Sequence, residues 1–513
     1  MISAFANLLR LLLIARTLAR HDALFPLERL GIAPGIMLLV RLVSRRRAPG
    51  RPGERLAAAC AALGPTFIKL GQALSVRSDL VGEDVAADLS GLQDRLPPFP
   101  AAAARAIVEA ELGQPLDILF DRFDAEPIAA ASIAQVHSAT TAEGAEVAVK
   151  VLRPGVEERF ASDIAVMYWV ARLVERARPS FRRLKPVEVV RTFEDTVRLE
   201  MDFRLEAAAA AELADNFAGY PGFRVPVVDW GRTARRVLTT AWVDGIPIDE
   251  IAALAEAGLD PRDIVARSAE VFFYQVFRDG FFHADIHPGN MFVGRDGALM
   301  PVDFGIMGRL DRKTRNYLAD MLLGFLQRDY RRVADVHFAA GYVPAHQSRE
   351  AFMQAARSIG EPILGRPLQE ISLARLLAQM FQVTEQFEME TQPQLLLLQK
   401  TMLVAEGVSR TLDPALNMWV LAQPLIEEWM VANRGPQARL REAAETALDQ
   451  LERLPALFDR LEQASRMIGE GGIRLHPDTV ESLRGGGRSP WPTALALAGV
   501  AALAAAVAVV LAG

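Results

Sequence analysis

The sequence predicts an α+β fold with two lobes, a small lobe that contains strands and a larger helical lobe, with a helical N-terminal extension and a C-terminal transmembrane helix. Three observations support this prediction. A short β-rich run covers residues 146–152, and further strand-like runs lie near 224–228 and 236–242. Residues 246–430 are mostly helical in pattern. The chain ends in 21 uncharged, largely apolar residues, which is long enough to span a bilayer core.

Composition indicates a globular protein with a basic N-terminal segment. Of its 513 residues, 51% are hydrophobic and 23% are charged, enough for sizeable cores. The net charge is −6, but residues 1–55 hold ten arginines and three acids, a local +7, which leaves −13 for the rest. This pattern favours an anionic membrane surface over a nucleic acid, and no nucleic-acid fold signature is present. The single cysteine, Cys60, excludes a disulfide framework within the chain.

The N-terminal segment, residues 1–55, is aliphatic as well as basic. Its first twenty residues lack an A-x-A cleavage site and carry arginines within the apolar stretch. We therefore expect an amphipathic helix that lies on a membrane, and not a signal peptide. A second aliphatic patch covers Ile36 to Val43. Packing of both stretches against the rest of the protein is an equally open interpretation, and residues 48–55 are interpreted as a linker.

Proline and glycine signals divide the middle of the chain. Residues 56–125 are a predicted helical extension, which a proline-rich stretch at 97–100 interrupts before a helix over 101–112. The small lobe is predicted over 126–243 and the helical lobe over 244–430.

Two segments are predicted beyond residue 430. Residues 431–490 form an amphipathic helical connector, with a helix over 434–468 and a flexible glycine joint at 485–487. Residues 491–513 form a transmembrane anchor, in which Trp491 suits the membrane interface and the preceding Arg484 and Arg488 stay in the cytoplasm. A buried core helix is the other interpretation of this segment.

The catalytic signal lies in two short segments, HADIHPGN at 283–290 and DFG at 303–305. Asp285 comes five residues before Asn290, and Asp303 comes thirteen residues after it. Phosphoryl transfer from ATP needs such a set, because one carboxylate orients the nucleophile while an amide and a second carboxylate hold magnesium. The run at 297–302 is typical of a hairpin strand that leads to Asp303. A metal site formed by His283, Asp285 and His287 is the competing interpretation.

Two further parts of a kinase-type site lie upstream. Lys150 lies in the β-rich run, where a kinase has the lysine that binds the α- and β-phosphates. An alanine loop takes the place of the glycine-rich phosphate loop and comprises Ala129, Ala130, Ala131, Ser132, Ile133, Ala134, Gln135 and Val136. Lysines are scarce, since arginine has replaced them almost everywhere. The five that remain are candidates for roles that arginine cannot fill: Lys69, Lys150, Lys185, Lys313 and Lys400.

With these motifs, the chain resembles the UbiB, or ABC1/ADCK, family of atypical kinase-like proteins over roughly residues 55–430. Lys69-Leu70-Gly71-Gln72 matches the KxGQ motif of the family, and Glu200-Met201-Asp202 matches its ExD motif. Glu206 falls where the family has its helix glutamate. The alanine-rich stretch at 129–132 matches the family's replacement of the glycine-rich loop.

The resemblance implies a two-lobed protein-kinase-like fold and a role for each catalytic motif. The alanine loop and Lys150, held by Glu206, bind ATP. Asn290 and Asp303 bind Mg²⁺, and Asp285 orients the nucleophile.

The resemblance also implies a regulatory part. Lys69 pairs with Glu200 and Asp202, and the helix that carries Lys69 and Gln72 folds over the nucleotide site, where a protein substrate docks in other kinases. No Ala-Pro-Glu signal follows the DFG segment. An ordinary protein kinase is therefore disfavoured.

In function, the resemblance implies a membrane-anchored ATPase that supports ubiquinone biosynthesis, with its catalytic part on the cytoplasmic side of a bacterial inner membrane. The implied partners are anionic lipids, polyprenyl-phenol intermediates and other ubiquinone-biosynthesis enzymes. Two alternatives stay open. A small-molecule or lipid kinase can share the H-x-D-x-H-P-x-N loop, and a non-catalytic scaffold can bind nucleotide without turnover.

Overall fold

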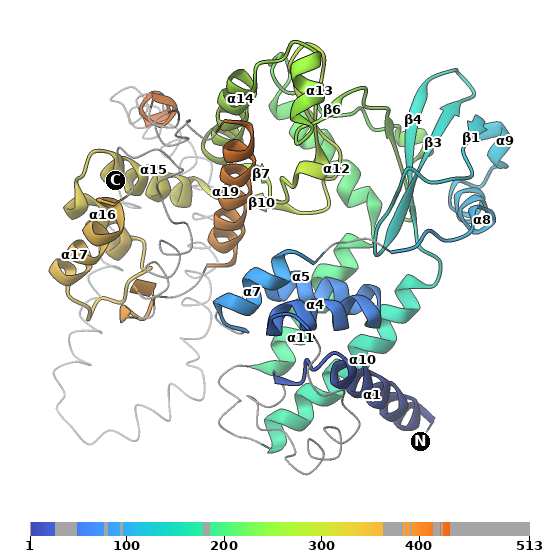
Figure 1. Ribbon diagram of the computed structural model, residues 1–513, viewed down its shortest axis with the longest axis horizontal. Coiled ribbons are helices and arrows are strands. Elements are labelled where there is room, and N and C mark those ends of the chain that lie inside the picture. The colour runs from blue at the N-terminus through green and yellow to red at the C-terminus, as the bar shows by residue number, and fades with distance from the viewer. Residues whose placement is uncertain are drawn as a thin grey trace, which may run out of the picture. The chain divides into compact units, whose positions relative to one another are not determined.

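The computed structural model describes residues 2–25, 49–75, 81–92, 96–177, 185–362, 383–384, 386–389, 392–413, 421 and 424–430 (Figure 1). These all belong to one compact unit, residues 1–431. None of the helices in these segments is both long and apolar enough to cross a membrane. The aliphatic patch at 36–43, the connector helix at 434–468, the glycine joint and the anchor at 491–513 lie outside the described residues.

The small lobe is built on an antiparallel sheet. Its strands are β1 (Phe120–Phe123), β2 (Ala129–Ala130), β3 (Ala134–Thr141), β4 (Glu146–Leu152) and β5 (Val237–Ala241). The order is β1-β3-β4-β5, and β2 pairs with the start of β3. The predicted strand at 236–242 is confirmed. The one at 224–228 is wrong, since that segment makes only an isolated bridge from Val228 to Thr240.

The two faces of β4 have different environments because side chains alternate along a strand. Val147, Val149 and Val151 point into a buried cluster with Ala104 and Val108 of α8 (Ala101–Leu112). The α8 helix begins and ends where the sequence predicts it. Lys150 lies between these valines in sequence and therefore faces the other side of the sheet, with Val136 and Leu238 as its neighbours in register.

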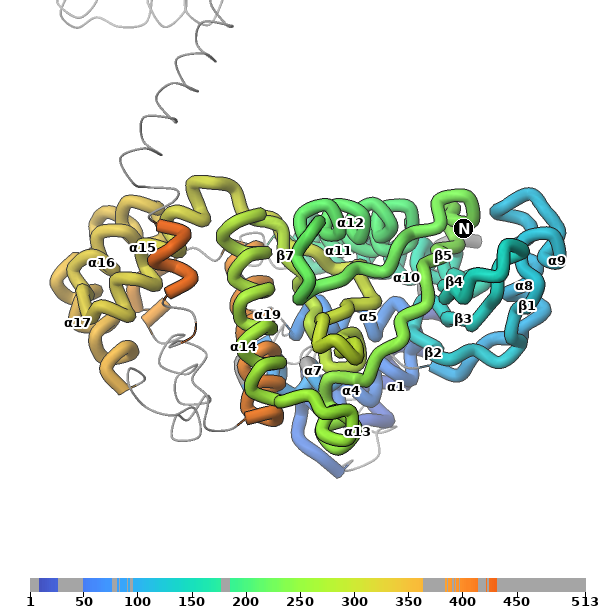
Figure 2. Tube along the Cα trace, turned by 90° about the horizontal axis from the view of Figure 1, so that it is seen from above, coloured from blue at the N-terminus to red at the C-terminus, as the bar shows by residue number. Residues whose placement is uncertain are grey.

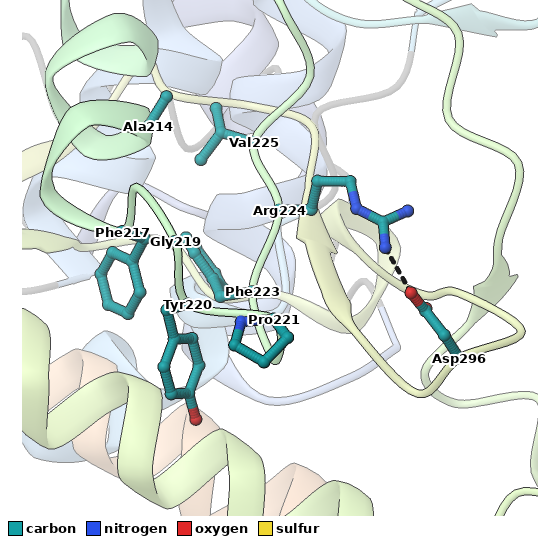
Figure 3. Close-up of a pocket in the computed structure, with 9 residues that line it drawn as sticks. All are labelled: Ala214, Phe217, Gly219, Tyr220, Pro221, Phe223, Arg224, Val225 and Asp296. Carbon is teal, nitrogen blue, oxygen red and sulfur yellow. Dashed lines mark hydrogen bonds and ion pairs between the residues drawn. The ribbon is translucent and has the colours of Figure 1, made fainter.

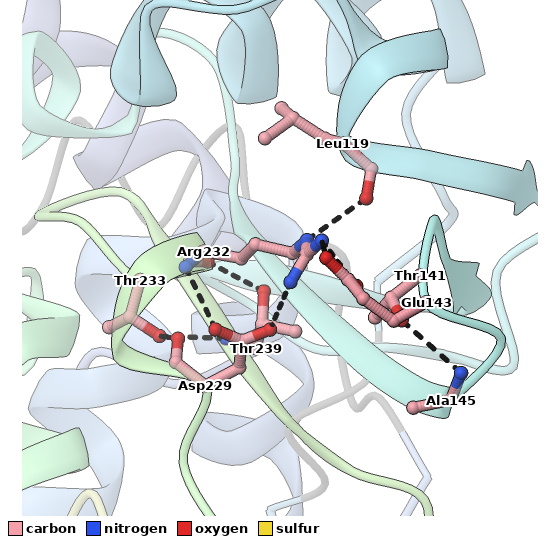
Figure 4. A network of polar contacts seen from close by, with 8 residues as sticks. All are labelled: Leu119, Thr141, Glu143, Ala145, Asp229, Arg232, Thr233 and Thr239. Carbon is pink, nitrogen blue, oxygen red and sulfur yellow. Dashed lines mark hydrogen bonds and ion pairs between the residues drawn. The ribbon is translucent and has the colours of Figure 1, made fainter.

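A network around Arg232 joins the edge of this sheet to the chain that leads into β5 (Figure 4). The guanidinium donates to the Leu119 carbonyl at 2.9 Å, to Asp229 at 2.8 Å and to Glu143 at 2.7 Å. The hydroxyl of Thr239 donates to the Arg232 carbonyl at 2.6 Å. These bonds fix the β3–β4 turn and the first residues of β5 relative to each other.

The helices behind the sheet correct one prediction. A single helix over 187–217 is predicted, but the structure has two, α11 (Pro186–Glu200) and α12 (Phe203–Asn216). The break occurs because Asp202 leaves the helical conformation and its side chain accepts a hydrogen bond from the Arg204 N–H, which caps α12. Glu200 and Glu206 thus lie on different helices, and α10 (Val156–Ala177) packs against α11.

The N-terminal extension packs on α10 and α11 as a layer of short helices: α1 (Ile2–Arg20), α4 (Pro52–Leu63), α5 (Pro65–Ser75) and α7 (Glu83–Ser90). The helical prediction for the first twenty residues is confirmed. Arg10 donates to the buried Asp163 of α10 at 2.5 and 3.0 Å, which ties α1 to the lobe. A compact core that includes Leu56, Cys60 and Leu89 joins α4, α5 and α7.

The helical lobe surrounds two small sheets that carry the catalytic segments. One sheet has the order β6 (Ile246–Pro247), β8 (Met291–Val293), β9 (Leu299–Pro301), and the other pairs β7 (Phe281–His283) with β10 (Met307–Arg309). Figure 2 shows α14 (Pro261–Phe273) beside α19 (Pro393–Leu412). The other named elements are α9 (Leu116–Leu119), α13 (Ile251–Glu256), α15 (Arg312–Leu326), α16 (Tyr330–Ala339), α17 (Arg349–Gly360) and short turns at Trp230–Arg232, Tyr274–Asp279 and Pro288–Asn290.

Candidate nucleotide site

Lys150 of β4 forms an ion pair with Glu206 of α12. The ammonium donates to the two carboxylate oxygens at 2.7 and 3.0 Å. The pairing expected for these residues is therefore confirmed. Glu206 also accepts a hydrogen bond from the Phe304 N–H at 3.4 Å, so one buried carboxylate joins the strand lysine, α12 and the DFG segment.

Asp303 extends this group into the helical lobe. Its Oδ1 lies 3.5 Å from the Lys150 ammonium and accepts from the Gly305 N–H at 3.0 Å. Burial acts to raise the pKa of Asp303, but Lys150 and the Gly305 N–H outweigh it and hold the pKa well below its usual range. Burial acts to lower the pKa of Lys150, but Asp303 and Glu206 hold it above the ordinary value. Both groups are therefore charged near pH 7.

The hairpin of β8 and β9 places Asn290 beside the DFG segment. The Asn290 carbonyl accepts from the Val302 N–H at 3.1 Å, and its side-chain amide donates to the Asp285 carbonyl at 3.4 Å. The predicted strand that delivers Asp303 is confirmed as β9. Asp285, Asn290 and Asp303 thus lie around one site, as a phosphoryl-transfer mechanism requires.

His283 has a structural role that removes the competing metal interpretation for it. Its Nε2 is hydrogen-bonded to the Asp303 carbonyl, and its Nδ1 accepts from the Asp285 N–H at 3.2 Å. Burial lowers its pKa, which keeps the ring neutral. The main-chain N–H of His283 donates to the side chain of Gln275, which lies in the π-helical turn at Tyr274–Asp279. Such turns are often found near functional sites. Within the described residues, no group of three or more His, Cys, Asp or Glu side chains is placed to hold a metal.

The alanine loop forms a tight turn between β2 and β3, closed by a hydrogen bond from the Ala131 N–H to the Ala134 carbonyl at 2.8 Å. Arg153 holds the turn from behind by donating to the Ala131 carbonyl at 3.0 Å. Two of its predicted nucleotide-binding side chains point elsewhere. Ile133 lies in the main core, and Gln135 is fully buried and bonded to the Phe99 main chain at 2.9 and 3.2 Å.

The KxGQ segment lies on α5, and its lysine reaches the ExD segment. Lys69 Nζ is 3.0 Å from Glu200 Oε2, within ion-pair distance although the two groups are not oriented for a hydrogen bond. Asp202 caps α12 and binds Arg204 at 2.6 and 2.9 Å, a role that the sequence does not predict. The positive charge of Lys69 also helps to lower the pKa of Asp303. Gln72 is half-buried, and its carbonyl accepts from Ser75 at 2.7 Å.

One residue of this site is missing from the predicted set. Lys400 of α19 places its ammonium 3.0 Å from Asp285 Oδ1. The scarcity of lysine in this chain singles it out as a candidate, but its distance of 115 positions from Asp285 hides the contact.

In the described part of the chain, hollows also lie outside this group of charged residues. A hollow of about 310 Å³ follows the end of α12, where Tyr220 points toward α14 and Arg224 pairs with Asp296 (Figure 3). A smaller hollow of about 200 Å³ lies beside the segment 283–290. Its lining is mostly apolar and includes Ile248, Pro288, Val404 and Val408.

Comparison with known proteins agrees with this geometry. Residues 91–337 match the ABC1 atypical kinase-like domain, and residues 356–417 match the UbiB helical domain. The probable protein kinase UbiB of Pseudomonas putida (strain W619) is 41% identical over 95% of this chain and 97% of its own. The Azotobacter vinelandii protein of the same name is 45% identical over 83% and 79%. The Mycobacterium tuberculosis Rv3197–erythromycin complex aligns with a TM-score of 0.52 and 26% identity, covering 71% of this chain and 93% of that chain.

Proposed function

Because this chain belongs to the UbiB family of atypical kinase-like proteins, we propose that it is an Mg-ATP-dependent ATPase that works at a membrane surface in support of ubiquinone biosynthesis. The observation that carries the proposal is the charged group of Lys150, Glu206 and Asp303, which joins strand β4, helix α12 and the DFG segment beside Asp285. This is the arrangement that phosphoryl transfer needs.

The residues present suit magnesium as the partner of ATP. Asn290 and Asp303 offer oxygen ligands, and Mg²⁺ in nucleotide sites takes one or two protein ligands together with phosphates and water. A closed cage of protein side chains is therefore not required. When bound, the ion neutralises phosphate charge. Lys150 binds the α- and β-phosphates, and Asp285 orients the attacking oxygen and accepts its proton.

Hydrolysis, and not protein phosphorylation, is the activity favoured by the surroundings of the site. The chain after the DFG segment passes through β10 directly into α15, which Asp311 caps. That short connection offers no platform for a protein substrate. The Lys69–Glu200 pair also holds α5 against the ExD segment. Water or a small lipid-derived group is then the acceptor.

Membrane attachment is supported by α1 within the described part of the chain. Leu9, Leu12 and Leu13 expose 53%, 58% and 48% of their surface although they are large and apolar. Arg16 and Arg20 lie further along the same basic helix. An amphipathic helix with these features binds an anionic lipid surface. The membrane is where polyprenyl-phenol intermediates and the other enzymes of the pathway are available as partners.

Phosphate release from γ-labelled Mg-ATP tests the proposal, with and without cardiolipin-containing liposomes. We expect liposomes to stimulate release by the wild type, Asp303→Asn to abolish it, and Leu9→Ser/Leu12→Ser to remove only the stimulation. Retained nucleotide binding without any release above Asp303→Asn would contradict the ATPase and indicate a scaffold. Label in lipid or protein would instead identify a kinase.

A further inference from the structure

Lys400 forms an ion pair with the carboxylate that is assigned as the base, and it comes from outside the kinase-like domain. Its ammonium lies 3.0 Å from Asp285 Oδ1. The residue belongs to α19, within residues 356–417 that match the helical domain, whereas the kinase-like match ends at residue 337. The pair is reachable from solvent, since Lys400 exposes 30% and Asp285 36% of their side chains. A ligand at Asp285 can therefore also reach Lys400.

The position of Lys400 is fixed by its neighbours on α19. Leu398 is buried in the core that contains Phe282 and Ala284. The fully buried hydroxyl of Thr401 lies 3.3 Å from the Ala284 carbonyl, directly before Asp285. Helix α19 is thus packed onto residues 282–284, directly before Asp285, on both sides of Lys400. This packing places Lys400 within reach of Asp285.

The charge distribution of the site indicates a role for the Lys400 cation. The segment from His283 to Asn290 contains no lysine or arginine. Lys150 is engaged with Glu206 and Asp303. Negative charge on the three equatorial oxygens of a transferring γ-phosphoryl group needs a cation nearby, and the base must lie close to the same group to orient the nucleophile. A cation held against the base is therefore placed beside the γ-phosphoryl position.

We propose that Lys400 binds the γ-phosphoryl group of ATP and is a catalytic residue that the helical domain contributes to the kinase-like site. The proposal rests on the proposed function. In hydrolysis, the water oxygen forms a bond to the γ-phosphorus, and the bond to the β,γ-bridging oxygen breaks with its electron pair leaving on ADP. The water proton passes to Asp285 and then to solvent. Lys400 takes no part in the proton transfer, and its ammonium pairs first with Asp285 and then with the γ-phosphoryl group.

Nucleotide affinities test this assignment without relying on turnover. Binding of Mg-ADP and of the non-hydrolysable Mg-AMPPNP is measured by calorimetry on the full-length wild type, Lys400→Met, Lys400→Arg and Lys313→Met. Lys313 is exposed at the start of α15 and contacts Tyr317, so it is a matched control. We expect Lys400→Met to weaken Mg-AMPPNP about tenfold, as loss of a charge-assisted hydrogen bond does, and to leave Mg-ADP unchanged. Lys400→Arg should be intermediate.

The possible failures are distinguishable. A wild type that binds neither nucleotide overturns the proposed function. A wild type that binds both, with the same ratio of affinities in Lys400→Met, overturns only the role of Lys400. Equal weakening of both nucleotides, with a lower thermal midpoint, means that Lys400 merely holds α19 in place and also overturns the assignment. If Lys400→Met does not fold, the ratio of the Mg-AMPPNP and Mg-ADP affinities in Lys400→Arg tests the role of Lys400, because arginine keeps the charge but changes its geometry. A ratio equal to that of the wild type overturns the assignment.

Discussion

At the residue scale, the space around Gly308 shows how closely the DFG region is packed. Gly308 pairs with Phe282 across β10 and β7, and a Cβ atom built on Gly308 comes within 2.1 Å of the Phe282 ring. That ring is fully buried in the core with Leu310 and Ala284. A side chain at position 308 therefore forces the buried ring of Phe282 to move, and Phe282 directly precedes His283.

We expect Gly308→Ala to destabilise the protein by about 1–3 kcal/mol, the usual cost of overpacking a core. Thermal unfolding followed by fluorescence measures the effect. Gly407→Ala is the control, since a Cβ there meets nothing within 4 Å in the middle of α19, and it should be neutral or stabilising by up to about 1 kcal/mol. Equal thermal unfolding midpoints for the two variants would show that the core around β7 and β10 accommodates the extra methyl group without loss of stability.

Cys60 is a second residue whose surroundings decide its chemistry. It lies on α4, is buried in the core that joins α4, α5 and α7, and is close to Gly71 of the KxGQ motif. Burial raises its pKa to about 12. Because the thiolate is the reactive form, the native thiol is inert near pH 8.

We expect a thiol reagent to label native Cys60 slowly at pH 8, and to label it at once in guanidinium, with Cys60→Ser as the blank. The folded pKa is raised, so the thiol contributes stability that is present below its unfolded pKa of roughly 8.5 and lost as the pH rises toward about 12. Rapid stoichiometric labelling of the native protein would mean that the α4–α5 core opens readily.

At the element scale, a mostly buried ion pair adds to the packing of α5 on its neighbouring helices. Lys69 and Glu200 expose only 12% and 13% of their side chains. Removal of the lysine leaves Glu200 without that cation in a region of little solvent, where an uncompensated charge is costly. The orientation of α5 should then loosen, and the nucleotide site should become more open.

Lys69→Ala is accordingly expected to change nucleotide affinity and to raise autophosphorylation, measured with labelled ATP. Lys185→Ala is the matched control, because Lys185 also pairs with a glutamate, at 3.1 Å, but both partners are exposed, where ion pairs contribute little. If Lys69→Ala and Lys185→Ala both behave as the wild type does, α5 does not restrain phosphoryl transfer.

At the scale of the whole molecule, the proposed nucleotide site draws on both lobes. Lys150 comes from β4, Asp303 from the end of the β8–β9 hairpin, and Lys400 from α19. A nucleotide that contacts Lys150 of one lobe and Asp303 of the other binds the folded protein alone. Such a ligand stabilises the fold in proportion to the logarithm of its concentration over Kd, about 2.7 kcal/mol at a hundredfold excess.

Mg-ADP at a hundredfold excess over its Kd should therefore raise the thermal midpoint of the wild type by several degrees, roughly 2–4 °C for each kcal/mol. Lys150→Met should remove most of this shift. Lys185→Met, whose lysine lies on the surface before α11, should keep it. A wild type that binds Mg-ADP by calorimetry yet shows no shift would mean that the ligand also binds unfolded chains.

The sequence alone determined the parts of this protein that depend on local pattern. The α8 helix, the strand that carries Lys150, the strand before Asp303 and the α+β class all follow from periodicity and from proline and glycine positions. The spacing of Asp285, Asn290 and Asp303 predicts one site, because the β8–β9 hairpin brings Asn290 and Asp303 together and the Asn290 amide bonds to the Asp285 carbonyl. The pairing of Lys150 with Glu206 follows from the family resemblance.

Only the tertiary structure decided the features that depend on contacts between distant segments. The expected long helix breaks at Asp202 because the Asp202 side chain caps α12. A cap of this kind competes with continuation of the helix, and helix propensities alone do not predict which of the two forms. The burial of Gln135 follows from the approach of Phe99. The meeting of Lys400 with Asp285 depends on where α19 packs, since a contact across 115 residues leaves no periodic signal in the chain.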